Sequence, residues 1–98
     1  MYTGMKSITE TITTPVTLSC DVAVCGGGIA GISAALAAAR RGSDVLLIER
    51  EFAPGGLSTL GLVTIYLPIC DGMGHQVIYG IGEELLRLSI KHGCECKR

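Results

Sequence analysis

The segment "AVCGGGIAGISAALAAARRG", residues 23–42, is compatible with two very different structures. Apart from one serine, every residue before its first arginine is apolar or glycine, and such a run is long enough to consider as a membrane-spanning helix. Gly27 and Gly31 also have the G-x-x-x-G spacing that lets two membrane helices pack closely. However, Gly26, Gly28 and Gly31 form G-x-G-x-x-G, a pattern typical of phosphate-binding turns. The first question is therefore whether this segment crosses a bilayer or binds a phosphate.

The residues on either side favour the phosphate-binding turn. The run "DVAVC" at 21–25 is short, apolar and β-branched, which indicates a buried strand that ends at three glycines. The alanine-rich stretch 29–41 predicts a helix, and Gly42 follows it where a C-terminal cap belongs. A second apolar run, "DVLLIE" at 44–49, predicts another buried strand. Each of the three glycines would weaken a membrane helix by about 1 kcal/mol relative to alanine.

The order strand, helix, strand with short links predicts the fold class. We expect an α/β protein built on a Rossmann-like βαβ dinucleotide-binding unit, with parallel strands and a right-handed crossover. Because both strands are unbroken apolar runs, we expect them to be buried on both faces. Two strands are fewer than such a sheet normally has, so the sheet is expected to be incomplete.

Each glycine of the motif has a physical role in the phosphate interpretation. Gly26 permits the tight turn from strand to helix, and Gly28 lacks a Cβ, so the backbone can approach a pyrophosphate. Gly31 lets the helix pack close to the sheet. The amides of Ile29 and Ala30 then point at the phosphates from the positive end of the helix. The simpler alternative is a glycine turn that binds no nucleotide.

An acidic residue stands where such a site would bind a ribose. Glu49 follows Gly31 by 18 residues, close to the spacing of about 20 that this motif leads one to expect. A carboxylate at the end of the second strand accepts hydrogen bonds from the two ribose hydroxyls. It would also repel a 2′-phosphate, which argues against NADP.

With these motifs in place, the sequence resembles the FAD-dependent oxidoreductases that begin with a Rossmann domain. The resemblance covers residues 20 to about 93 and includes Glu49 and Arg50 followed by the double glycine of "PGGLST". That double glycine is much less typical of an NAD-binding dehydrogenase half-domain, which is the alternative enzyme. The segment "DGMGHQVIYGIGEELL" further resembles a subgroup whose substrates are frequently unassigned.

The resemblance implies FAD as the cofactor, together with an unknown small-molecule substrate. It places Arg50 near the adenine, and it places three further residues near the pyrophosphate or the ribityl chain: Gly56, Leu57 and Ser58. The flavin carries the redox chemistry in such enzymes, so no catalytic residue is assigned.

The chain divides into an N-terminal extension at 1–19 and a partial FAD-binding Rossmann domain at 20–98. Apolar and polar residues alternate to some extent in the extension, so it could form a short edge strand. A helix is expected at 82–92. Members of the family are several times longer, and a third strand should begin at "CECKR". We therefore expect a truncated gene product, with a non-catalytic remnant as an alternative. The unpaired edge of its sheet could recruit a second chain.

Composition excludes several other classes of function. The chain has 98 residues and a net charge of −1, and its eight basic residues are scattered, unlike a nucleic-acid-binding surface. The N-terminus has no apolar run behind a basic start, so a secretory signal is not expected. Five cysteines are an odd number with no disulfide pattern, which favours reduced thiols in the cytoplasm. We expect no association with membranes.

Three further features have a functional and a simpler interpretation. Cys94 and Cys96 could be half of a metal site, but a frayed end with two incidental thiols is favoured, and no metal site is predicted. Cys70 could face the flavin as a redox thiol, although a buried structural cysteine is the simpler interpretation. His75 could donate a proton to the substrate, whereas its glycine-rich surroundings favour an exposed polar residue.

Overall fold

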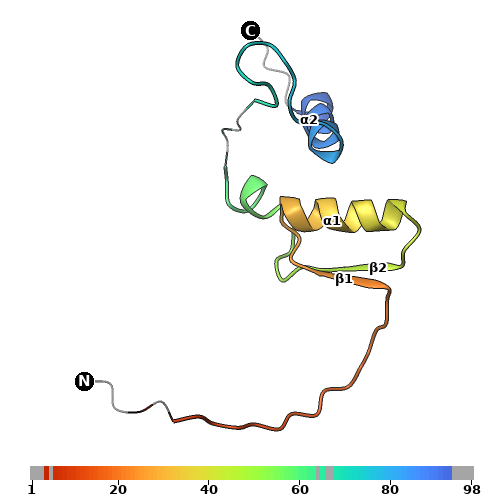
Figure 1. The fold of residues 1–98 in the computed structure, drawn as a ribbon, viewed down its shortest axis with the longest axis vertical. Coiled ribbons are helices and arrows are strands. Elements are labelled where there is room, and N and C mark those ends of the chain that lie inside the picture. Colours follow the sequence, from red (N-terminus) through yellow and green to blue (C-terminus); the bar gives the residue numbers. More distant parts are fainter. Residues whose placement is uncertain (1–3, 5, 64, 66–67, 94–98) are drawn as a thin grey trace.

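The computed structural model describes residues 4, 6–63, 65 and 68–93 (Figure 1). Its elements are, in order, β1 (Val22–Cys25), α1 (Ile29–Arg40), β2 (Val45–Ile48), a short 3-10 helix η1 (Gly56–Ser58) and α2 (Ile81–His92). This order confirms the α/β class and the predicted strand–helix–strand unit. The predicted ends of both strands, α1 and α2 agree with the structure to within one residue.

The two strands form a parallel pair, as the short apolar runs predicted. Val22 lies opposite Val45, and Cys25 lies opposite Ile48. The amide of Gly26 donates to the carbonyl of Ile48 at 2.8 Å, so pairing continues into the first residue of the glycine turn. Helix α1 lies over one face of this pair (Figure 1). The three elements form a Rossmann-like βαβ unit whose sheet is incomplete, because it has two strands in the described chain.

Helix α1 approaches the end of β1 closely at its first turn because Gly31 has no side chain. A Cβ built on Gly31 would overlap the carbonyl oxygen of Gly26 and would lie 3.5 Å from Cγ1 of Val24. Farther along the helix, Ile32 and Leu36 lie over the strand side chains Val45 and Leu47 together with alanines. The closest approach therefore falls where the chain turns from strand into helix.

The expectation that the strands are buried on both faces is wrong for the described residues. The face turned toward α1 is partly covered, but Ala23 and Cys25 are exposed on the other side, and Ile48 is 49% exposed. No apolar residue of the described chain is fully buried. An apolar run shows which surfaces a strand is able to bury, but it does not supply the layer that buries them.

Two other segments at the ends of the chain bear on the predictions. Residues 6–19 run as extended chain away from the βαβ unit (Figure 1), with no strand assigned, so the edge strand stays a prediction. The third strand predicted at "CECKR" lies outside the described residues.

In the part of the chain that the structure describes, no helix is long and apolar enough to cross a membrane. The glycine segment itself forms a turn and the 12-residue α1.

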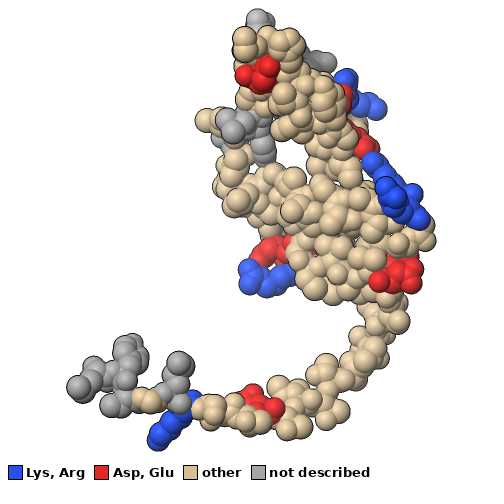
Figure 2. All heavy atoms as spheres, viewed as in Figure 1, with Lys and Arg blue, Asp and Glu red and all other residues tan. Residues whose placement is uncertain are grey.

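The hairpin before α2 and α2 itself form the second part of the structure. Cys70 and Gln76 form an antiparallel bridge, and the amide of Val77 donates to the carbonyl of Ile69 at 2.9 Å. Arg40 at the end of α1 pairs with Glu84 at 2.8 Å, which links the two helices. On the face in Figure 2, basic side chains lie beside acidic ones rather than in one continuous field.

The contact at Gly31 predicts a strong dependence of stability on this position. We expect Gly31→Ala to lower the free energy of unfolding by about 3 kcal/mol, because the added methyl group forces α1 away from Gly26. Gly82→Ala is the matched control, since its Cβ would meet a single side-chain atom, Cγ2 of Ile78 at 3.2 Å, and no backbone. Urea unfolding followed by circular dichroism measures both variants. Equal stability of the two would contradict the close contact at Gly31.

Candidate functional site

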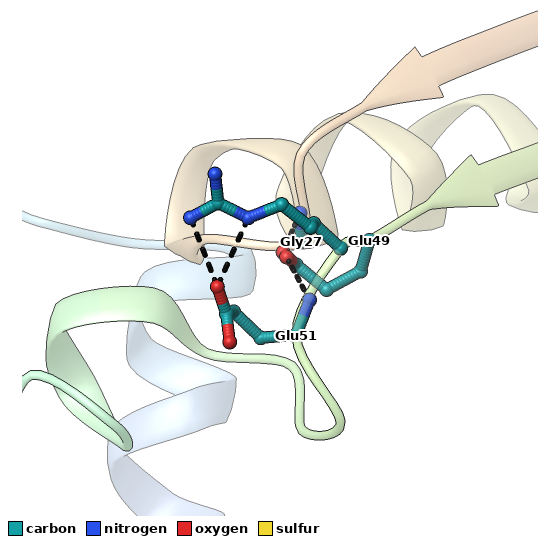
Figure 3. A network of polar contacts seen from close by, with 4 residues as sticks. Gly27, Glu49 and Glu51 are labelled. Atoms are coloured by element: carbon teal, nitrogen blue, oxygen red, sulfur yellow. Dashed lines mark hydrogen bonds and ion pairs between the residues drawn. The ribbon is translucent and has the colours of Figure 1, made fainter.

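Three segments from two distant parts of the sequence meet at the N-terminus of α1. They are the glycine turn 26–28 after β1, the acidic segment 49–51 after β2, and the second glycine segment 55–58. Because the carboxyl ends of parallel strands lie at the same edge of a sheet, the first two segments are neighbours. Figure 3 shows the contact between them.

The glycine turn leaves an open space in front of the helix. Gly26 has a φ of 103°, in the left-handed region that favours glycine. Gly28 is the N-cap of α1, and a Cβ built on it would meet no atom within 4 Å. Ile29 and Ala30 begin the helix, where the N–H groups of the first turn have no acceptor inside the helix. The helix dipole adds partial positive charge at the same place.

Glu49 holds the glycine turn through its carboxylate (Figure 3). Its Oε2 accepts a hydrogen bond from the amide of Gly27 at 2.5 Å, and its Oε1 accepts one from the amide of Glu51 at 2.9 Å. A Cβ on Gly27 would lie only 2.8 Å from Oε2, so this contact requires glycine. The sequence placed Glu49 at the site but did not predict that it bonds the turn itself.

The two amides also determine the charge of Glu49. Hydrogen bonds from the backbone of Glu51 and Gly27 lower the pKa of the Glu49 carboxyl below its ordinary value of 4.5. The group is therefore ionised at neutral pH. A carboxylate has about four acceptor positions, of which the two amides occupy two. Glu49 retains the capacity to accept hydrogen bonds from a ribose.

Arg50 is exposed and pairs with its neighbour in the sequence. Its side chain is 91% exposed, and its Nε and Nη2 donate to Oε1 of Glu51 at 3.0 and 2.9 Å. Exposed ion pairs of this kind contribute little to stability. The position of Arg50 near an adenine stays a prediction.

The second glycine segment packs directly on the first. The amide of Gly55 donates to the carbonyl of Gly27 at 2.7 Å, and Gly28 and Gly55 form a parallel bridge. A Cβ on Gly56 would lie 3.1 Å from Cα of Gly28. Leu57 is 75% exposed and Ser58 is half-buried in η1. The structure thus brings this predicted segment to the same end of α1 as the glycine turn.

Two of the residues that build the site were missing from the predicted set. Gly27 and Gly55 are buried in the described chain, and they join the two glycine segments through the backbone. Gly55 has a φ of 114°, and a Cβ there would come within 2.7 Å of Oγ1 of Thr59. That hydroxyl donates to the carbonyl of Pro54 at 2.9 Å. The runs of consecutive glycines at 26–28 and 55–56 were the sequence signal that could have identified these two residues.

The paired cysteines, Cys70 and His75 are the remaining candidates from the sequence. Among the described residues, no three His, Cys, Asp or Glu side chains are placed to hold a metal ion, and Cys94 and Cys96 lie outside that set. Cys70 is half-buried rather than buried. His75 is exposed as predicted, but it contacts Asp71 in a way that the sequence did not predict.

Comparisons with known proteins find a reductase, an electron transfer flavoprotein-quinone oxidoreductase and a dehydrogenase. The chain is 33% identical over 70 residues to a thioredoxin reductase of Ureaplasma parvum serovar 3, covering 71% of this chain and 23% of that protein. It is 48% identical over 42 residues to a probable electron transfer flavoprotein-quinone oxidoreductase of Escherichia coli, covering 43% of this chain and 10% of that protein.

A third relative is the 4-oxocyclohex-2-ene-1-carboxylate 5-dehydrogenase of Sinomonas cyclohexanicum, which is 40% identical over 52 residues, 53% of this chain and 9% of that protein. The chain thus spans less than a quarter of the length of these curated relatives. No solved structure matches the chain.

The extent of the family match agrees with the geometry. The family model for FAD-dependent oxidoreductases matches residues 21–97, which include both strands, both helices and all three segments of the site. The chain therefore belongs to the FAD-dependent oxidoreductase family.

Proposed function

We propose that the N-terminus of α1 binds the pyrophosphate of FAD and that Glu49 binds the adenosine ribose. The observation that carries this proposal is the open space at Gly28, which faces a helix N-terminus and lies beside an ionised carboxylate. The space suits a phosphate because backbone N–H groups and the helix dipole both favour an anion there. The carboxylate suits hydroxyl donors rather than a phosphate, which favours an unphosphorylated ribose.

The residues of the chain divide the binding between them. The amides of Ile29 and Ala30 donate to the phosphates, and the glycines at 26, 28 and 31 keep the approach free of side chains. Segment 56–58 lies against Gly28 and contacts the pyrophosphate or the ribityl chain. Arg50, whose exposed side chain is long, reaches the adenine. FAD supplies hydride acceptance when it is bound, while the protein supplies position and electrostatics.

FAD is favoured over NAD by the second glycine segment. Gly55 and Gly56 lie against the first turn through a backbone hydrogen bond and a close Cα approach, so they extend the phosphate cradle beyond the G-x-G-x-x-G turn. The family to which the chain belongs uses FAD. An NAD-binding half-domain would not need this added backbone.

The wider role of the protein follows from the same interpretation. We propose that residues 20–98 act as the FAD-binding part of an oxidoreductase for a small-molecule substrate, with residues 1–19 as an extension. The described cysteines, Cys20, Cys25 and Cys70, are free thiols, which supports a reducing compartment such as the cytoplasm. The outer edges of β1 and β2 have no partner in the described chain, which supports self-association.

The phosphate site can be tested at Gly28. We expect Gly28→Val to abolish FAD binding while the helical circular dichroism is retained, because the branched side chain fits the free protein but fills the phosphate space. Protein purified with FAD in excess is assayed for the flavin released on denaturation. Ala34→Val, on an exposed position of α1, is the control. A Gly28→Val protein that binds FAD like the wild type would contradict the proposed site.

The role of Glu49 gives a prediction with a defined dependence on pH. Glu49→Gln should weaken FAD binding roughly ten- to a hundredfold at neutral pH, because charge-assisted hydrogen bonds to the ribose are lost. Since the amides of Glu51 and Gly27 lower the pKa of Glu49, its carboxylate is lost only as the pH falls through a pKa below the ordinary value of 4.5. Titration calorimetry should therefore show a difference in affinity between wild type and variant that is constant around neutral pH and narrows only in acid, as the pH approaches that lowered pKa. A gap that closes near neutral pH would contradict the assignment.

Self-association is tested on β1, whose outer edge has no partner strand in the described chain. We expect the sedimentation coefficient of the chain to rise with concentration, and we expect Ala23→Lys to suppress this rise, because a charge on an edge strand opposes further pairing. Ala34→Lys places the same charge on α1 and serves as the control. Identical concentration dependence in all three proteins would rule out association through this strand.

A further inference from the structure

The peptide unit between Pro54 and Gly55 joins the second glycine segment to the glycine turn. Its N–H group, on Gly55, donates to the carbonyl of Gly27 at 2.7 Å. In a planar trans peptide unit the C=O and N–H groups point in opposite directions, so the carbonyl of Pro54 is turned away from Gly27. A group that holds this carbonyl therefore also sets the direction of the N–H group.

The side chain of Thr59 holds the carbonyl end of that peptide unit. Its Oγ1 lies 2.9 Å from the carbonyl oxygen of Pro54 and 3.4 Å from that of Gly56. A hydroxyl has one proton to donate, so the shorter contact, with Pro54, is the stronger hydrogen bond. A Cβ built on Gly55 would lie 2.5 Å from Cγ2 of Thr59, which shows that the threonine side chain packs directly on this glycine.

The backbone of η1 places Thr59 for this contact. The amide of Thr59 donates to the carbonyl of Gly56 at 3.2 Å, and its carbonyl accepts from the amide of Leu62 at 3.1 Å. The amide of Ser58 donates to the carbonyl of Gly55 at 3.1 Å. The hydroxyl of Thr59 thus starts from a turn that is already closed by backbone hydrogen bonds.

Gly55 needs such a contact because its own conformation is weakly determined. Its φ is 114°, and glycine adopts positive and negative φ about equally readily. The orientation of its peptide unit is therefore set by external hydrogen bonds rather than by a side chain of its own. That orientation matters to the site, because a Cβ built on the next residue, Gly56, would lie 3.1 Å from Cα of Gly28.

We propose that Thr59 is a positioning residue of the FAD site. Its hydroxyl fixes the orientation of the Pro54–Gly55 peptide unit and thereby holds Gly56 against Gly28 before the cofactor binds. The inference rests on the proposed function, because Gly28 and segment 56–58 form the proposed pyrophosphate cradle. Thr59 acts through the backbone of the second glycine segment, and it strengthens binding because the cradle is already ordered when FAD arrives.

The first test measures the backbone of the protein without FAD. Thr59→Val keeps the shape of the side chain but removes the hydroxyl, and Thr59→Ser keeps the hydroxyl. We expect the amide of Gly55 to exchange with deuterium about two- to tenfold faster in Thr59→Val and at the wild-type rate in Thr59→Ser. The amide of Gly26, which donates to the carbonyl of Ile48 at 2.8 Å, is the internal control and should not change. Unchanged exchange of Gly55 in Thr59→Val would overturn the proposal.

The second test measures the affinity for FAD by titration calorimetry. Thr59→Val should weaken binding about two- to tenfold, as expected for the loss of one hydrogen bond, and Thr59→Ser should bind like the wild type. Thr13→Val makes the same change at an exposed threonine of the extension and should have no effect. Circular dichroism checks that the helices are retained in every variant. The reverse order, with Thr59→Ser weakened and Thr59→Val unchanged, would assign the effect to the methyl group and overturn the role of the hydroxyl.

The outcomes separate this inference from the function on which it rests. A wild-type protein that binds no FAD contradicts the proposed function, and the role of Thr59 in the site is rejected with it. If the wild type binds FAD and Thr59→Val binds it equally tightly, the role of Thr59 is rejected while the FAD site stands. Weaker binding by Thr59→Val with unchanged exchange of Gly55 would mean that the hydroxyl contacts FAD itself, which also overturns the positioning role.

Discussion

The hydrogen bond from the amide of Gly27 to the carboxylate of Glu49 is the interaction on which the rest of the site depends. It connects the ends of two strands whose pairing stops one residue after β1, and so it fixes the direction in which the chain enters α1. The same carboxylate bonds the amide of Glu51 and directs the chain toward the second glycine segment. One side chain thus aligns all three segments, while the second glycine segment joins the glycine turn through backbone atoms.

The parts of this structure that depend on neighbouring residues were predictable. Apolar runs, alanines and capping glycines give the strands and helices to within a residue, and the spacing of the glycines indicates the turn. The partner of Glu49 was not predictable, because the contact requires the register of β1 against β2. The open face of the sheet was also mispredicted, since Cys25 and Ile48 are apolar but have no covering layer in the described chain.

The contact between His75 and Asp71 shows a different limit of sequence reasoning. The two residues are four positions apart, a spacing usually considered in helices. Here, left-handed backbone at Gly72 and Gly74 brings them together in a hairpin. A pattern of residue types does not state which glycines take positive φ. An interaction that is short in sequence can therefore be as difficult to foresee as one between distant strands.

The join between Gly27 and Gly55 is made without side chains, and this has a consequence for how the protein tolerates mutation. At these two positions function depends on the absence of a side chain, so every substitution adds volume and is expected to weaken the contact. Adjacent positions such as Ile29 and Leu57, which contribute their backbone and expose their side chains, can vary in chemical character. Tolerance to substitution along this stretch should therefore alternate sharply from one residue to the next, a pattern set by steric volume rather than by chemistry.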